Sequence, residues 1–284
     1  MTLKALCSLS VAVLTAAASA AQPPTFSSKV DAVRIDVLVT DRGEVVRGLG
    51  ATDFEVRDNG VPQHVELVSF DQVPLDVVLA LDLSDSVAGN RLLDLKGASR
   101  ALIDTLAPAD QGALLSFNHS VSLRSPLTKD IEQLRDALVD ISASGDTSLY
   151  DGTYAAMRVG EKGPGRDLMV VFSDGRDTAS WLSADQVVES ARRADIVAYG
   201  LTLRGSASGQ FLQKLAEQTG GEAFELESTR DLRARFLSIL EGFRQRYLIS
   251  YSPTGVPRGG WHRLDVRLKG RRAAVRARPG YFDR

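Results

Sequence analysis

The sequence predicts an α/β fold, in which a doubly wound, mostly parallel sheet is inserted in a small β-sandwich-like domain built from both ends of the chain. Two observations predict it. Between residues 74 and 246, short apolar runs alternate with segments of helix length, as in a parallel sheet covered by helices. On either side, residues 27–73 and 247–284 alternate apolar and polar side chains, which is typical of strands.

The first 20 residues have the pattern of a signal peptide. Lys4 supplies a positive charge, Ala5 to Ala17 form a short apolar core, and Ala18-Ser19-Ala20 matches a cleavage site. We expect cleavage after Ala20 and export to the periplasm or outside the cell; an uncleaved anchor is the alternative. The single cysteine, Cys7, lies in this segment, so the mature chain would have no disulfide. No later apolar run is long enough for a membrane span.

The N-terminal β segment is expected over residues 21–73. In "VRIDVLVTD", from Val33 to Asp41, apolar residues recur at every second position, which predicts a strand with one buried face. "DNG" at Asp58–Gly60 predicts a tight hairpin turn between two further strands.

The α/β segment is expected over residues 74–246. Its strands are the apolar runs "LDVVLALD", "GALLSFN", "DLMVVFSD" and "IVAYGLTL". Because these runs are apolar on both faces, helices should cover both sides of the sheet. Apolar residues three and four positions apart predict those helices; they are Leu92, Leu95, Ala98, Leu102 and Leu106, then Leu134, Leu138 and Ile141, then Val187, Val188 and Ala191, then Phe236, Leu237, Leu240 and Phe243.

The C-terminal β segment is expected over residues 247–284. In "HRLDVRLK", the residues Leu264, Val266 and Leu268 occupy alternate positions, with charged residues between them. Each terminal segment has about three strands, too few for an independent sandwich. We therefore expect residues 247–284 to pair with residues 21–73.

Polar residues gather where predicted segments leave one edge of the sheet; they are Asp82, Ser84, Ser86, Thr147 and Asp174. Ligands of parallel α/β sheets bind at the carboxyl ends of the strands, so these side chains are expected to converge. Asp82, Ser84 and Ser86 can aim at one point, because alternate residues of an extended backbone share a side. Two carboxylates and three hydroxyls form an all-oxygen set that suits Mg²⁺, Mn²⁺ or Ca²⁺ and is poor for zinc.

The order Asp82-x-Ser84-x-Ser86, then Thr147, then Asp174 resembles the metal-ion-dependent adhesion site of the von Willebrand factor A (vWA) domain. This resemblance covers roughly residues 74–246. The flanking stretches "VRGLGATDFEVRDNGVPQ" and "RYLISYSP…RARPGYF" resemble a bacterial family of exported vWA-domain-related proteins, and that resemblance covers nearly the whole mature chain.

The resemblance implies a role for each residue. Ser84 and Ser86 would coordinate the ion through their hydroxyls, and Thr147 directly or through water. Asp82 and Asp174 would act mostly through water. One position of the octahedron would stay open, and in vWA domains an acidic residue of a protein partner fills it.

Each of these residues also has an ordinary structural interpretation. Ser86 could cap a helix starting near Val87, and Asp174 could be a turn residue in "SDGRD". Ser148 and Asp151 match a capping box, so Asp151 is interpreted as a cap rather than a ligand. Three neighbouring carboxylates are expected to be solvated; they are Asp85, Asp146 and Asp177.

The favoured function is therefore an exported, non-catalytic module that binds a protein partner through a divalent ion. A structural scaffold with a vestigial metal site is one alternative. A metal-dependent hydrolase or phosphotransferase is another, but position 84 is Ser where the haloacid-dehalogenase type needs a second Asp. A net charge of −2 and 6% aromatic residues give no support for nucleic-acid binding.

Overall fold

The computed structural model describes residues 32–70 and 73–283. The predicted signal peptide at residues 1–20 lies outside the described residues, so cleavage and export stay predictions. Within the described ranges, no helix combines the length and the apolar character needed to cross a bilayer.

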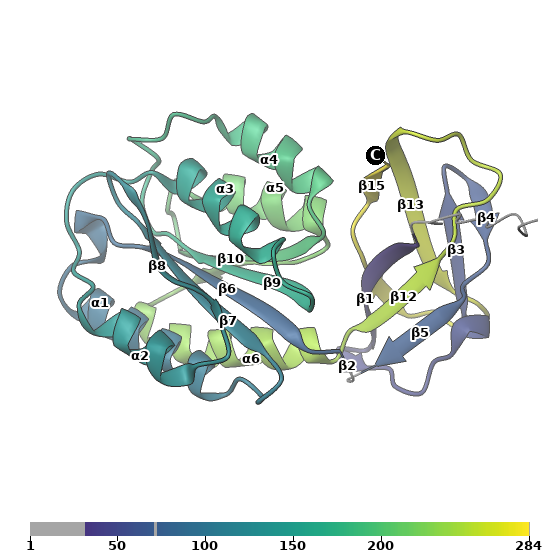
Figure 1. Ribbon diagram of the computed structural model, residues 1–284, viewed down its shortest axis with the longest axis horizontal. Helices are drawn as coiled ribbons and strands as arrows, with labels where there is room; N and C mark the ends of the chain where they lie inside the picture. The colour runs from purple at the N-terminus through teal and green to yellow at the C-terminus, as the bar shows by residue number, and fades with distance from the viewer. Residues whose placement is uncertain (1–31, 71–72, 284) are drawn as a thin grey trace, which may run out of the picture. The chain divides into compact units, whose positions relative to one another are not determined.

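The α/β region is built on strands β6 (Leu75–Asp82), β7 (Gln111–Phe117), β8 (Val121–Thr128), β9 (Arg166–Phe172), β10 (Ile196–Leu203) and β11 (Ala223–Leu226). They form one sheet in the order β11-β10-β9-β6-β7-β8 (Figure 1). Neighbouring strands from β11 to β7 pair in parallel, and β8 pairs antiparallel with β7 at one edge. Because β6 lies inside the sheet between two helical layers, all of its residues are buried.

Helices cover both faces of this sheet (Figure 1). One face carries α3 (Leu149–Gly160), α4 (Ala184–Arg193) and α5 (Gly209–Thr219), and the other carries α1 (Asn90–Asp104), α2 (Ile131–Val139) and α6 (Leu232–Arg244). Successive residues of β6 pack into two different apolar clusters, one on each face of the sheet. Leu79 belongs to the same cluster as Leu102 and Phe236, and Ala80 belongs to the same cluster as Met157. Short 3₁₀ turns lie at η2 (Asp85–Val87) and η3 (Thr229–Asp231).

Local sequence explains where several helices begin and end. Asp130 caps α2, since its carboxylate accepts hydrogen bonds from the backbone N–H groups of Glu132 and Gln133. Ser183 and Gln186 form a reciprocal capping box at the start of α4. Gly220 ends α5 in the left-handed region at φ 77°, a conformation that favours glycine.

Strands from both ends of the described chain pair with one another. One sheet has the order β14-β1-β12-β5, with β2 paired to β1, and the other has the order β15-β13-β3-β4. Ile35 and Val37 of β1 share a buried apolar cluster with Phe54 and Tyr247. The strands are β1 (Val33–Asp41), β2 (Glu44–Val45), β3 (Phe54–Asp58), β4 (Val61–Gln63), β5 (Leu67–Phe70), β12 (Tyr247–Tyr251), β13 (Gly260–Leu268), β14 (Ala274–Arg276) and β15 (Gly280–Asp283); a 3₁₀ turn, η1 (Ala51–Asp53), precedes β3.

The predicted fold class is confirmed: residues of the middle segment form a doubly wound, mostly parallel sheet, and residues of the terminal segments form antiparallel sheets. The hairpin at "DNG" is also present, with Asn59 at φ 46° and Gly60 at φ 84° between β3 and β4. The edge strands β8 and β11 and the helix α5 were not predicted. In α5, Phe211, Leu212 and Leu215 are buried, so the helical spacing was present in the sequence.

Candidate metal site

Asp82 is the last residue of β6, and its side chain is completely buried. Its Oδ1 accepts a hydrogen bond from the backbone N–H of Ser84 at 2.8 Å. Its Oδ2 accepts one from the Ser173 hydroxyl at 2.6 Å. Burial raises the pKa of Asp82 above its ordinary value, and these hydrogen bonds partly offset that rise.

Ser84 and Ser86 bring their hydroxyls together just after this strand. Their Oγ atoms lie 3.0 Å apart. Ser84 is buried, whereas Ser86 is exposed. The Ser86 hydroxyl also donates to Oδ1 of Asp174 at 2.5 Å, which joins the loop after β6 to the loop after β9.

Thr147 lies two residues before the start of α3 and is the fifth residue of the candidate site. The residue is 5% exposed, and among the described residues its Oγ1 has no hydrogen-bond partner. Its backbone is held firmly, since its O accepts from the N–H groups of Thr178 at 2.8 Å and Ala179 at 3.0 Å. Its N–H donates to the Thr178 hydroxyl at 3.1 Å. Thr147 therefore presents, on a fixed backbone, a hydroxyl that has no partner among the described residues.

Gly175 shows that these oxygen atoms surround one small space. A Cβ built on Gly175 would lie 3.1 Å from Thr147 Oγ1, 3.6 Å from Ser86 Oγ and 3.9 Å from Asp82 Oδ2. The three oxygen atoms come from two segments, the end of β6 with the turn that follows it and the residues before α3, and all three lie within 4 Å of one point. This hollow, together with its all-oxygen lining, fits a hard divalent ion.

Arg91, in the first turn of α1, contacts Asp174 and Ser86 from the solvent side. Its guanidinium lies 2.7 Å from Asp174 Oδ2 and donates to the backbone O of Ser86 at 3.0 Å. The Arg91 side chain is 49% exposed, whereas the Asp174 side chain is 2% exposed. The guanidinium of Arg91 therefore offsets part of the negative charge of Asp174.

Backbone hydrogen bonds fix the loops to one another. Leu83 N–H donates to Phe117 O at 2.8 Å, at the end of the neighbouring strand β7. Asp85 N–H donates to Gly145 O at 3.0 Å, and Ser144 N–H donates to Leu83 O at 2.8 Å. The loop that carries the two serines is thus joined to the loop that carries Thr147.

The structure does not show the helix caps that were the alternative interpretation of Ser86 and the favoured interpretation of Asp151. Ser86 lies within the 3₁₀ turn η2, and α1 begins at Asn90 after Gly89, so Ser86 caps no α-helix. The Ser148 side chain caps nothing either: α3 has no side-chain cap hydrogen bond. Asp174 directs its carboxylate at Ser86 and Arg91 rather than at a local turn.

Asp151 and Asp177 instead hold the loop that follows Asp174. The carboxylate of Asp151 accepts from the backbone N–H groups of Trp181 at 2.9 Å and Leu182 at 3.0 Å. Asp177, which was expected to be solvated, accepts from the N–H of Tyr150 at 3.0 Å. Asp85 and Asp146 are exposed as expected.

The structure therefore brings all five predicted residues together. Within residues 32–70 and 73–283, no group of three or more His, Cys, Asp or Glu side chains is placed to hold a metal ion, so an ion here depends on the hydroxyls. The sequence analysis missed Arg91, Ser173 and Gly175. Ser173 and Gly175 flank Asp174 directly, but their contacts depend on which way the loops fold.

With this geometry established, the comparison with known families is informative. Residues 76–236 match the von Willebrand factor type A domain family. The chain belongs to this family. Its vWA domain includes β6 and α3 and carries all five residues of the candidate site.

Among curated proteins, the chain is similar to the inter-alpha-trypsin inhibitor heavy chain H4 of Bos taurus, with 24% identity over 226 residues. The match covers 74% of this chain and 25% of that protein. The chain thus spans about a quarter of the length of this relative.

Solved structures support the vWA fold at low sequence identity. A von Willebrand factor type A protein from Catenulispora acidiphila has a TM-score of 0.58 and 12% identity, and the match covers 81% of this chain and 73% of that one. The proximal thread matrix protein 1 from the mussel byssus, whose MIDAS motif is occupied by zinc, has a TM-score of 0.55 and 14% identity, with 66% of this chain and 49% of that one covered.

Proposed function

We propose that this protein is an exported, non-catalytic vWA protein that binds a protein partner through a divalent metal ion. The observation that supports the proposal is the hollow at Gly175, which side-chain oxygens of two segments border, Asp82 and Ser86 after β6 and Thr147 before α3. An ion bound there would offer an open coordination position to an acidic side chain of the partner.

The five side chains of the proposed site have two different roles, according to their charge. Ser84, Ser86 and Thr147 are placed to hold the ion through neutral hydroxyls. Asp82 and Asp174 supply negative charge from behind them, where their carboxylates now accept hydrogen bonds from the hydroxyls of Ser173 and Ser86. Because the proposed site contains only two carboxylates, a bound dication would keep some attraction for a partner's carboxylate.

We propose Mg²⁺, Mn²⁺ or Ca²⁺ as the ion, because all five side chains offer hard oxygen ligands. The mussel protein carries zinc in its MIDAS motif, so zinc belongs in the experiment as a competitor. Titration calorimetry of the metal-free protein should give one site for a hard ion, with an affinity in the range of about 10 μM to 10 mM. Heat of binding for zinc alone would contradict the choice of ion.

The sharpest test of the site is Gly175→Ala, which removes no ligand. The added methyl group would occupy the hollow 3.1 Å from Thr147 Oγ1, so Mg²⁺ should no longer raise the melting temperature. The matched control is Gly97→Ala in α1, because a Cβ there meets nothing within 4 Å; this variant should keep the full Mg²⁺ shift. An unchanged shift in Gly175→Ala would place the ion elsewhere.

The scaffold alternative makes the opposite prediction. If the site is vestigial, Mg²⁺ raises the melting temperature of no variant, because a ligand stabilises only the state it binds. Loss of folding in Ser84→Ala without metal would also favour a structural role. The export part of the proposal is tested separately, by sequencing the N-terminus of the secreted protein; a start other than residue 21 would contradict cleavage after Ala20.

A further inference from the structure

Trp181 is the most exposed large apolar side chain of the described residues, with 95% of its surface open to solvent. It lies in the loop from Gly175 to Leu182, directly after the candidate ligand Asp174. An indole in this position contributes almost no burial to the fold. Single exposed apolar residues are common on protein surfaces, so exposure alone does not indicate a binding role for Trp181.

The first half of the loop is fixed to the candidate site itself. Thr147 and Thr178 exchange two hydrogen bonds, from Thr147 N–H to the Thr178 hydroxyl at 3.1 Å and from Thr178 N–H to Thr147 O at 2.8 Å. Ala179 N–H adds a third to the same carbonyl at 3.0 Å. The loop is therefore attached by backbone hydrogen bonds to Thr147, one of the candidate ligands.

The second half is fixed to the first turn of α3, through Asp151. The two carboxylate oxygens of Asp151 accept from the N–H groups of Trp181 and Leu182. The Ser180 hydroxyl accepts from Asp151 N–H at 3.1 Å and donates to Asp177 at 2.5 Å. Leu182 packs against the apolar core of the vWA domain. The backbone of Trp181 is thus held on both sides while its side chain stays in water.

A rigidly held, exposed tryptophan is well suited to binding. Tryptophan offers a large apolar surface with only two rotatable side-chain bonds, so little conformational entropy is lost when a partner covers it. For that reason it is enriched among the residues that contribute most to interfaces. A fixed backbone lowers the entropy cost further.

We propose that Trp181 is the second contact of the candidate metal site: a partner places a carboxylate on the ion and an apolar side chain against the indole ring. The partner is a protein segment with an acidic residue and a nearby large apolar residue. The inference rests on the proposed function, since the ion supplies the first contact. It adds what would distinguish one acidic partner from another.

The experiment uses the mature protein with Mg²⁺ and a set of synthetic peptides. Each peptide has one central Asp among Gly and Ser residues, alone or with one Leu, Phe or Trp placed one to four positions away. Fluorescence anisotropy of labelled peptides gives the affinities. We expect peptides with an apolar residue at a favoured distance to bind at least about 10-fold more tightly than the Asp-only peptide, an effect of the size that one buried aromatic contact contributes.

Trp181→Ala should abolish this preference and leave the Mg²⁺ shift in melting temperature unchanged. The matched control is Leu67→Ala, which removes another exposed apolar side chain, 56% exposed, from β5; it should keep the preference. Asp82→Asn should lose both the Mg²⁺ shift and all peptide binding.

Several outcomes would overturn the inference while the proposed function stands. They are a preference that survives in Trp181→Ala, and a normal Mg²⁺ shift with no peptide preference in the wild type. Self-association in Mg²⁺ that depends on Trp181, seen by ultracentrifugation, would assign the indole to a second copy instead. Binding to phosphatidylcholine vesicles without Mg²⁺ would assign it to a lipid surface. Absence of any Mg²⁺ shift would overturn the proposed function itself, and this inference with it.

Discussion

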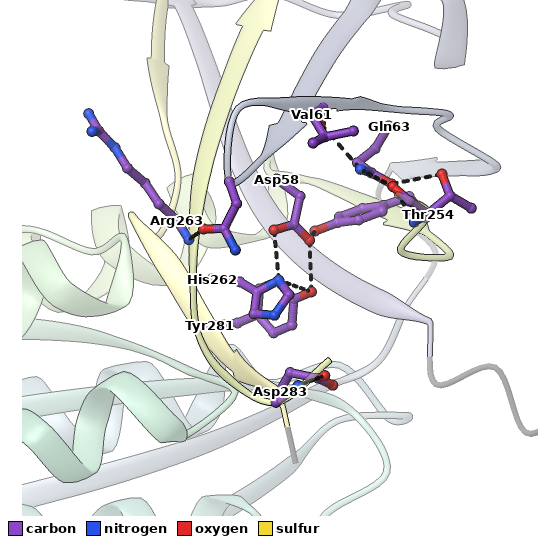
Figure 2. A network of polar contacts seen from close by, with 11 residues as sticks. Asp58, Val61, Gln63, Thr254, His262, Arg263, Tyr281 and Asp283 are labelled. Atoms are coloured by element: carbon purple, nitrogen blue, oxygen red, sulfur yellow. Dashed lines mark hydrogen bonds and ion pairs between the residues drawn. The ribbon is translucent and has the colours of Figure 1, made fainter. Parts of the chain in front are cut away.

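Asp58 and Asp82 are both completely buried carboxylates at the end of a strand, yet their surroundings differ. Three protein donors surround Asp58: the Tyr251 hydroxyl at 2.9 Å, the Tyr281 hydroxyl at 2.8 Å and Nδ1 of His262 at 2.8 Å. Figure 2 shows the rings of His262 and Tyr281 directed at the Asp58 carboxylate.

Asp58, Tyr251, His262 and Tyr281 form a closed cluster, in which the carboxylate accepts hydrogen bonds from side chains of the cluster itself. Burial, followed by the hydrogen bond to Asp58, raises the pKa of both Tyr251 and Tyr281, so their hydroxyls stay donors. Asp82 instead accepts two hydrogen bonds, from the Ser84 N–H and the Ser173 hydroxyl. Its Oδ2 and Thr147 Oγ1 both lie within 4 Å of the Cβ position of Gly175. The comparison teaches that burial alone does not distinguish the two carboxylates, whereas the groups that surround each of them do.

The largest expected effect is on the closed cluster. Asp58→Ala should lower the free energy of unfolding by about 3–5 kcal/mol, because three polar groups would remain buried without their acceptor. Tyr281→Phe removes a single donor and should cost about 1 kcal/mol. Urea denaturation measures both. A loss of under 1 kcal/mol in Asp58→Ala would show that the cluster is not what stabilises this region.

The second prediction concerns Asp167 in β9, a buried carboxylate whose Oδ1 has no partner among the described residues. Burial, and then the charge of Asp76, raise the pKa of Asp167 to about 8. The folded state therefore holds a proton that the unfolded state has released between about pH 4 and pH 8. The stability of the wild type should fall as pH rises through this range, because deprotonation is favoured only on unfolding.

Asp167→Asn should remove this dependence, since the amide cannot ionise. The variant should exceed the wild type by about 1–3 kcal/mol at pH 8 and match it near pH 4. Thermal unfolding between pH 4 and pH 9 measures the difference. Asp146→Asn, at an exposed position, is the control and should show no such trend. A constant difference across the pH range would exclude titration of Asp167 as the cause.

The third prediction concerns Asp82 in the candidate metal site. Asp82→Asn should change the free energy of unfolding in the absence of metal by no more than about 1 kcal/mol, because the amide oxygen can still accept hydrogen bonds and burial already disfavours the charge. The variant should lose its Mg²⁺-induced rise in melting temperature. A loss of stability as large as that of Asp58→Ala would erase the distinction between the two clusters.

The smallest effect is expected at Arg91. Arg91→Gln removes a positive charge beside Asp174, so the affinity for Mg²⁺ should rise about two- to fivefold at low salt, and the gain should shrink as salt is added. Calorimetry at two salt concentrations measures it, with Arg100→Gln on the same helix as the control. Weaker Mg²⁺ binding in Arg91→Gln would mean that Arg91 serves chiefly to position Asp174.

The sequence predicted the positions of the site residues better than the hydrogen bonds that they make. Asp82, Ser84 and Ser86 follow an apolar strand, and Asp174 follows another, so their common edge could be predicted from the parallel sheet alone. The cap interpretation of Asp151 was wrong because a local motif states which hydrogen bonds are available, not which are made. Asp151 matches a capping box with Ser148, but its carboxylate is used by the N–H groups of Trp181 and Leu182, about thirty residues on along the chain.

The sequence by itself determined the fold class, because apolar periodicity is a local property of the chain. It also determined which oxygen-bearing residues leave the sheet at one edge. Only the tertiary structure decided that Thr147 keeps an unpartnered hydroxyl, that Gly175 leaves the hollow open and that Arg91 faces Asp174. It alone separated Asp58 from Asp82. These properties depend on contacts between loops that are distant in sequence, and no spacing along the chain encodes whether a buried carboxylate finds enough donors.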